Sequence, residues 1–129
     1  MNEQEIHHLL YDIPENADYT DIPQELDLED VPKERVDKLR DLLHSDDLAV
    51  RFDAALLLTN WGVEDGLNTL IDLFEKGETK GFIPHHLHPY DDTNKHILDA
   101  LIGYWASQTD LHKEQEARKR IYPTIISII

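Results

Sequence analysis

One segment of the chain, residues 48–61, is apolar around most of a helical circumference. From Leu48 to Trp61 the sequence reads LAVRFDAALLLTNW. A helix on the surface of a protein buries only one stripe of side chains, whereas these apolar residues cover most of the helix. Such a helix must be contacted from more than one side. The segment therefore predicts a central helix with other helices packed around it.

The flanking segments have the periodicity of helices that bury one face. Apolar residues at Leu67, Leu70, Ile71 and Phe74 follow the i, i+3, i+4, i+7 pattern. Similar patterns predict helices over 3–11, over 32–44, from 92 or 93 onward, and from about 110 to the last residues, where Pro123 should kink or restart the helix. No segment alternates between apolar and polar residues, so the predicted fold is all-α.

The same periodicity predicts which side chains are buried. We expect Trp61 and Trp105 to lie buried or in seams between helices. On the fourth of these helices, the buried side is predicted to include Ile102. One core is expected to contain Phe52, Leu56, Leu70, Phe74, Leu98 and Leu101.

Composition excludes several classes of function. The 129 residues include 27 acids against 12 Lys and Arg, which gives a net charge of −15, and no cysteine. So acidic a chain is repelled by nucleic acids and by anionic lipid. Its apolar runs are too short to span a membrane. The absence of disulfides fits the cytoplasm. We therefore expect a cytoplasmic protein that binds neither nucleic acid nor membrane.

The length suits a single domain spanning residues 1–129. Within it we distinguish an irregular acidic N-terminal segment (1–31), a core of helices (32–77), a His-rich loop (78–91) and a C-terminal helix pair (92–129). The last residues are apolar and lack a capping signal, so the natural chain is expected to continue beyond Ile129.

Residues 46–74, DDLAVRFDAALLLTNWGVEDGLNTLIDLF, resemble a HEAT repeat. The resemblance rests on an acidic turn, Val50-Arg51, Ala54-Ala55, the turn at Gly62 and a leucine-rich second helix. It implies a short HEAT-like α-α superhelix of antiparallel helix pairs. It also implies that Arg51 pairs with an acid, for which Asp46, Asp47 and Asp53 are the candidates.

Negative charge is concentrated near the N-terminus. Residues 1–31 hold ten acids and no Lys or Arg, and apolar residues lie among the acids. Mixed acidic and apolar surface suits a protein interface, and clustered charge steers a basic partner toward it. The alternative is a solvated face that only confers solubility. The predicted partner-binding residues are Asp18, Tyr19, Asp21, Ile22, Glu25, Leu26, Asp27, Glu29, Asp30, Glu64, Asp65, Asp72, Glu75 and Asp91.

The segment 85–96 contains a cluster of metal-ligand residue types: His85, His86, His88, Asp91, Asp92 and His96. Imidazole and carboxylate groups can bind Zn²⁺ or similar ions. No regular element is predicted to arrange residues 85–88, so a solvated loop is the favoured interpretation. The sequence also has no nucleophile motif and no glycine-rich phosphate loop. We expect no cofactor, no metal site and no catalytic residues.

In its small size, its acidity and its helical pattern, this chain resembles the immunity proteins of bacterial toxin–immunity pairs. The resemblance implies a protein that blocks the active site of a basic, nuclease-type toxin domain. The alternative is a HEAT-like adaptor that binds a basic protein within a larger assembly. A metal-dependent enzyme using the His-rich loop is a third reading.

Overall fold

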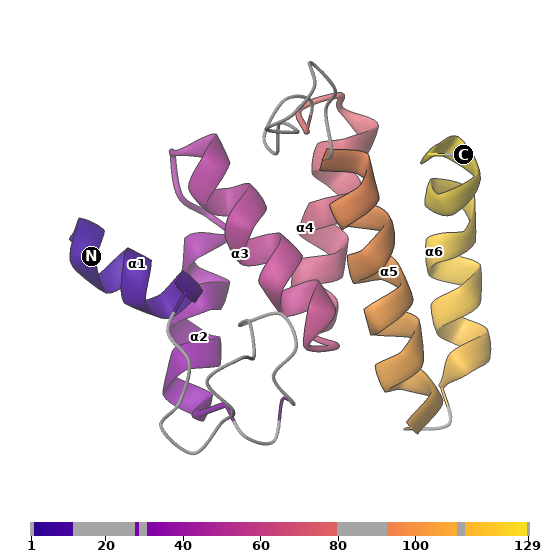
Figure 1. The fold of residues 1–129 in the computed structure, drawn as a ribbon, viewed down its shortest axis with the longest axis horizontal. Coiled ribbons are helices and arrows are strands. Elements are labelled where there is room, and N and C mark those ends of the chain that lie inside the picture. The colour runs from indigo at the N-terminus through magenta and orange to yellow at the C-terminus, as the bar shows by residue number, and fades with distance from the viewer. Residues whose placement is uncertain (1, 12–27, 29–30, 80–92, 111–112, 129) are drawn as a thin grey trace.

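The computed structural model describes residues 2–11, 28, 31–79, 93–110 and 113–128. These residues form helices and contain no strand, which confirms the predicted all-α fold. Figure 1 shows the helices arranged in a row. They are α1 (Glu3–Tyr11), α2 (Lys33–Leu42), α3 (Leu48–Asn60), α4 (Glu64–Glu75), α5 (Thr93–Asp110) and α6 (Glu114–Ile128).

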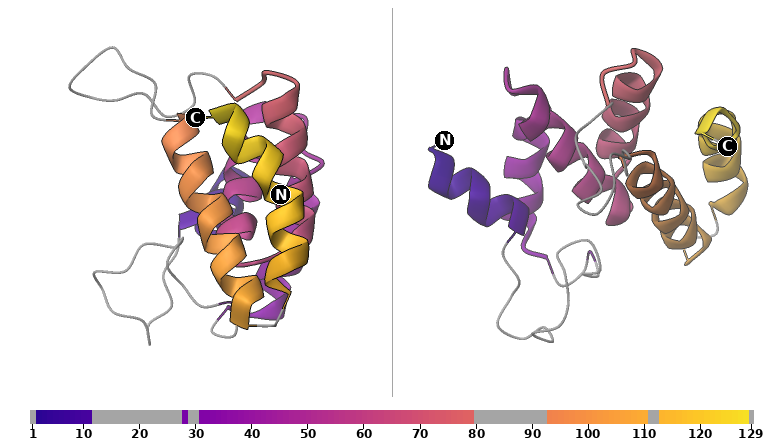
Figure 2. Two further views of the ribbon diagram at one scale, coloured as in Figure 1. Left: turned by 90° about the vertical axis from the view of Figure 1, so that its right-hand side faces the viewer. Right: turned by 45° about the horizontal axis from the view of Figure 1, so that its top comes forward.

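Helix α3 occupies the middle of the row. It contacts α1, α2, α4 and α5, and α5 in turn contacts α6. Successive helices α3 and α4, and then α5 and α6, run antiparallel, and α1 and α6 lie at opposite ends (Figure 1). Seen along the row, α5 and α6 are nearest the viewer and the other helices lie behind them (Figure 2). The predicted central helix is therefore confirmed.

The burial of α3 explains its apolar sequence. Every residue from Ala54 to Thr59 is buried, and Phe52 has no exposed surface. The helix begins after Asp47, whose carboxylate accepts hydrogen bonds from the backbone N–H groups of Ala49 (3.0 Å) and Val50 (3.4 Å). Such a cap satisfies donors that have no partner in the first helical turn.

A glycine lets α4 approach α3 closely. A Cβ atom on Gly66 would overlap the side chain of Leu58 and lie 3.0 Å from the backbone nitrogen of Thr59. The turn that joins the two helices contains Gly62, whose φ of +85° is in the left-handed region. Together these glycines allow α3 and α4 to pack closely, and this pair has the most extensive helix contact in the row.

The predicted core is only partly correct. Trp61, Phe52, Leu56, Leu70 and Leu101 are buried. Phe74 is partly buried against the core. Leu98 is half-buried and does not join the core cluster.

The predicted burial of Ile102 is wrong, whereas Trp105 is not buried but lies in the seam between α5 and α6, one of the two places expected for it. These side chains are 50% and 42% exposed. Helix α5 has two neighbouring apolar stripes, and the stripe that contains Ile97, Leu101 and Tyr104 is the buried one. Because α5 lies toward the end of the row, its second stripe is left at the surface.

Two further local expectations need correction. α5 continues to Asp110 and α6 begins at Glu114, later than predicted; α6 then runs through Pro123 without restarting. Arg51 forms no ion pair with Asp46, Asp47 or Asp53. Asp47 instead caps α3, and Asp53 accepts a hydrogen bond from Tyr11.

None of the helices in the described ranges is both long enough and apolar enough to cross a bilayer.

Candidate protein-binding surface

Helix α4 presents four carboxylates to solvent: Glu64, Asp65, Asp72 and Glu75 are all exposed, and no Lys or Arg lies between them in the sequence. Asp65 and Asp72 are seven residues apart, which places them on one side of the helix. Glu64 and Glu75 are eleven residues apart, about three turns, so they also lie on one side of the helix. These four residues, named here the α4 acidic face, are the part of the predicted binding site that the structure describes.

Cations from neighbouring elements contact this face without covering it. Arg40 of α2 places its Nε atom 3.2 Å from Asp65 Oδ2, and Lys76 Nζ lies 3.0 Å from Asp72 Oδ2. All four side chains are about half exposed. Ion pairs in such positions contribute at most about 1 kcal/mol. A basic partner can therefore replace these cations at little cost.

Glu64 has a different environment from the other three acids. It lines a polar recess of about 220 Å³ between α4, α5 and α6, together with Tyr104, Lys113 and Arg120. Burial, followed by the nearby charge of Glu64, raises the pKa of Tyr104. Arg120 also donates a hydrogen bond to Asn68 Oδ1 (3.1 Å). The Arg120–Asn68 hydrogen bond thus joins α6 to α4, and the two cations of the recess, Lys113 and Arg120, are balanced by two carboxylates, Glu64 and Glu116.

The remaining predicted site residues lie outside the described residues. This applies to Asp91, to His85, His86 and His88, and to all the predicted binding residues between Asp18 and Asp30. His96 is exposed in the first turns of α5. Within the described ranges, no three His, Asp or Glu side chains are grouped so that they could hold a metal ion.

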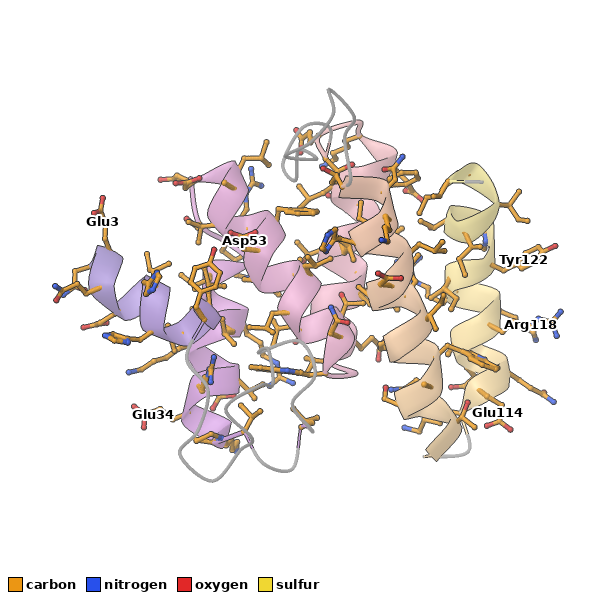
Figure 3. All side chains as sticks on the ribbon, in the orientation of Figure 1. Glu3, Glu34, Asp53, Glu114, Arg118 and Tyr122 are labelled. Carbon is orange, nitrogen blue, oxygen red and sulfur yellow. The ribbon has the colours of Figure 1, made fainter. Side chains whose placement is uncertain are left out.

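Sequence reasoning missed a second surface, the α5–α6 edge, which we define by the exposed apolar side chains Ile102, Trp105, Tyr122 and Ile126. They are 50%, 42%, 52% and 54% exposed. A depression of about 240 Å³ connects the two helices and is lined by Trp105, Arg118, Ile121, Tyr122 and Ile125. Figure 3 shows Arg118 and Tyr122 projecting from α6 to the outside of the row.

The sequence does indicate this edge, because α5 and α6 contain more apolar residues than one buried stripe requires. In α6, Ile121 and Ile125 pack on or against the core, whereas their neighbours Tyr122 and Ile126 do not. One helix face cannot bury adjacent residues of this kind equally well. An apolar pattern wider than a single stripe, in a helix at the end of a row, indicates an exposed patch.

Near the other end of the row, a hydrogen bond joins α1 to α3. The hydroxyl of Tyr11 donates to Asp53 Oδ2 at 3.2 Å. Burial, the largest influence, raises the pKa of Asp53; the Tyr11 hydrogen bond acts in the opposite direction, and the charge of Asp47 raises the pKa further. The ionised form of Asp53 is therefore disfavoured in the folded protein.

This raised pKa predicts a pH-dependent stability difference. The folded state holds the Asp53 proton more tightly than the unfolded state does. The stabilisation that results is fully present below the unfolded pKa and is lost as pH rises through the folded pKa. Asp53→Asn keeps an acceptor for Tyr11 but does not titrate. As pH rises from 4 to 7, its free energy of unfolding should therefore increase relative to that of the wild type. Urea unfolding of both proteins across this range measures the difference. A constant or shrinking difference would contradict the assignment.

No family model matches the chain, and no curated protein or solved structure is significantly similar to it. Its function must therefore be inferred from its own residues and surfaces.

Proposed function

We propose that this protein is a non-enzymatic binding module that captures a basic protein through the α4 acidic face. The observation that carries the proposal is the exposure of four carboxylates on one helix that contains no cation of its own. Solvation alone does not require acids to be gathered on one element. Gathered charge creates a local negative potential that attracts a basic surface before contact.

The partner that best fits this chemistry is a nuclease-type toxin domain. A nuclease binds phosphates, so its active-site cleft is basic, and carboxylates can occupy positions that phosphate groups would take. In this proposal the chain is a cytoplasmic immunity protein of a bacterial toxin–immunity pair, built as a short HEAT-like superhelix. It inhibits by covering the active site and contributes no catalytic group.

The acids of residues 18–30 and Asp91 extend the proposed site beyond α4. Their sequence adds apolar residues, including Tyr19, Ile22 and Leu26, between the carboxylates. In protein interfaces, buried apolar and aromatic groups supply most of the affinity, while charged groups at the rim set orientation and association rate. The proposed division is therefore between apolar anchors in the N-terminal segment and steering carboxylates on both elements.

Under this proposal the neighbouring gene encodes a basic nuclease domain, and the test uses that domain as the partner; a neighbouring gene of another kind would count against the proposal. The association rate constant of that domain with the full chain is measured by stopped-flow at increasing NaCl concentration, alongside inhibition of its nuclease activity. We expect the rate constant to fall by about tenfold or more from low to high salt, with a smaller change in dissociation rate. An association rate independent of salt, or binding without inhibition, would contradict the proposal.

A further inference from the structure

The α5–α6 edge is the largest concentration of exposed apolar side chains in the described part of the chain. Four of the six large apolar residues that are exposed there belong to it: Ile102, Trp105, Tyr122 and Ile126. They come from two adjacent helices, and two of them, Trp105 and Tyr122, line a common depression between those helices. Contiguous apolar surface of this kind marks interaction sites, whereas single exposed apolar residues do not.

The charges that line the depressions at this edge are positive, although the chain as a whole is strongly acidic. Arg118 lines the depression between α5 and α6. Arg118 and Lys119 also line a second depression, of about 460 Å³, along α6. Among the described residues, no carboxylate lines either depression. In a chain with 27 acids and 12 Lys and Arg, this is a local reversal of sign.

The spacing of the exposed side chains suits a helix as the occupant. Ile102 and Trp105 are three residues apart on α5, and Tyr122 and Ile126 are four apart on α6. These intervals form ridges along each helix, with a groove between them, into which the ridge of another helix packs. An apolar stripe at i, i+3, i+4 and i+7 matches such a groove.

We propose that the α5–α6 edge binds an acidic amphipathic helix of a partner protein. The apolar stripe of that helix packs between Trp105 and Tyr122, and its flanking carboxylates pair with Arg118 and Lys119. Charge complementarity selects this occupant. A second copy of the chain docked by the same edge would bring the two sets of cations together, and like charges in contact disfavour that dimer.

This inference does not depend on the proposed function, because the two surfaces favour partners of opposite charge. The α4 acidic face attracts a basic surface, whereas the α5–α6 edge attracts an acidic one. A protein with both surfaces can hold two different partners at once. The edge therefore favours the adaptor reading of the sequence as a second candidate function.

The test uses two synthetic helical peptides of about twenty residues, long enough to form helix in solution. Both have leucine at i, i+3, i+4 and i+7. One has glutamate at the flanking positions and the other has lysine there. Tryptophan emission reports binding, because Trp105 is 42% exposed and Trp61 only 2% exposed. We expect the glutamate peptide to shift the emission to shorter wavelength with a saturable curve, and the lysine peptide to have no effect.

Charge reversal at the edge provides the matched comparison. Arg118→Glu should lower the affinity for the glutamate peptide by about tenfold or more. Lys33→Glu makes the same change of charge at an exposed position at the start of α2, away from the edge. Its affinity for the glutamate peptide should stay within about twofold of the wild-type value. Circular dichroism confirms that both variants fold.

Four results would overturn the proposal. The first is no saturable shift with the glutamate peptide up to about 1 mM. The second is equal or tighter binding of the lysine peptide. The third is an Arg118→Glu variant that binds like the wild type. The fourth is a dimer in analytical ultracentrifugation that Ile126→Asp dissociates, because a second copy would then be the occupant.

Discussion

Replacing Asp72 and Glu75 by lysine should slow capture of the basic nuclease domain by about tenfold or more at low salt. Both side chains are exposed on α4, so the substitutions reverse charge without entering the core. The Lys76–Asp72 ion pair is lost, but pairs this exposed contribute little to stability. The effect should be largest on the association rate constant, measured by stopped-flow, and should shrink as salt is added.

The matched control reverses two acids on α1. Glu3→Lys with Glu5→Lys gives the same change in net charge at the far end of the row from α6, on residues outside the proposed site (Figure 1). If the α4 acidic face steers the partner, this control should change the rate much less than the α4 variant. Equal effects from both variants would show that only the total charge matters, and the α4 acidic face would not be the binding site.

Gly66→Ala should destabilise the fold by about 3 kcal/mol, because the added methyl group has no space between α3 and α4. It would overlap Leu58 and press against the backbone of Thr59 and the carbonyl oxygen of Ala55. Backbone atoms cannot rotate away as a flexible side chain can, so the helices must separate. The free energy of unfolding from urea titration measures this loss, which corresponds to a fall in Tm of roughly 10 °C.

Gly103→Ala is the matched control, because Gly103 is also a glycine inside a helix. A Cβ atom at this position would lie 3.3 Å from Asn60 Oδ1, the end of a side chain that can move. Alanine also has a helix propensity about 1 kcal/mol better than glycine. We expect Gly103→Ala to leave stability unchanged or slightly higher. A loss similar to that of Gly66→Ala would mean that helix contacts throughout the row, and not one close approach, limit stability.

The helices and the central position of α3 could be predicted because their signals are local. A segment that is apolar on nearly all sides requires neighbours on nearly all sides, whatever those neighbours are. The cap at Asp47 and the turn at Gly62 follow from backbone chemistry within a few residues. Such features depend little on how distant parts of the chain are arranged.

The surfaces could be predicted less well because they depend on which helix lies at the end of the row. Trp105 has the apolar character of a core residue, and only the absence of a covering helix from the described structure leaves it exposed. Similarly, the partner of Asp53 is Tyr11, which lies on another helix far away in sequence. The α4 acids are exposed as predicted, while the N-terminal acids that completed the predicted site lie outside the described residues.

The placement of α3 among four other helices has a consequence for how the sequence can change during evolution. A substitution that disturbs α3 acts on α1, α2, α4 and α5 together, because all of them pack on it. By contrast, α6 packs chiefly on α5. Its outer residues can therefore diverge without a cost to the stability of the rest of the molecule. New binding preferences can therefore arise at the ends of the array while its middle stays fixed.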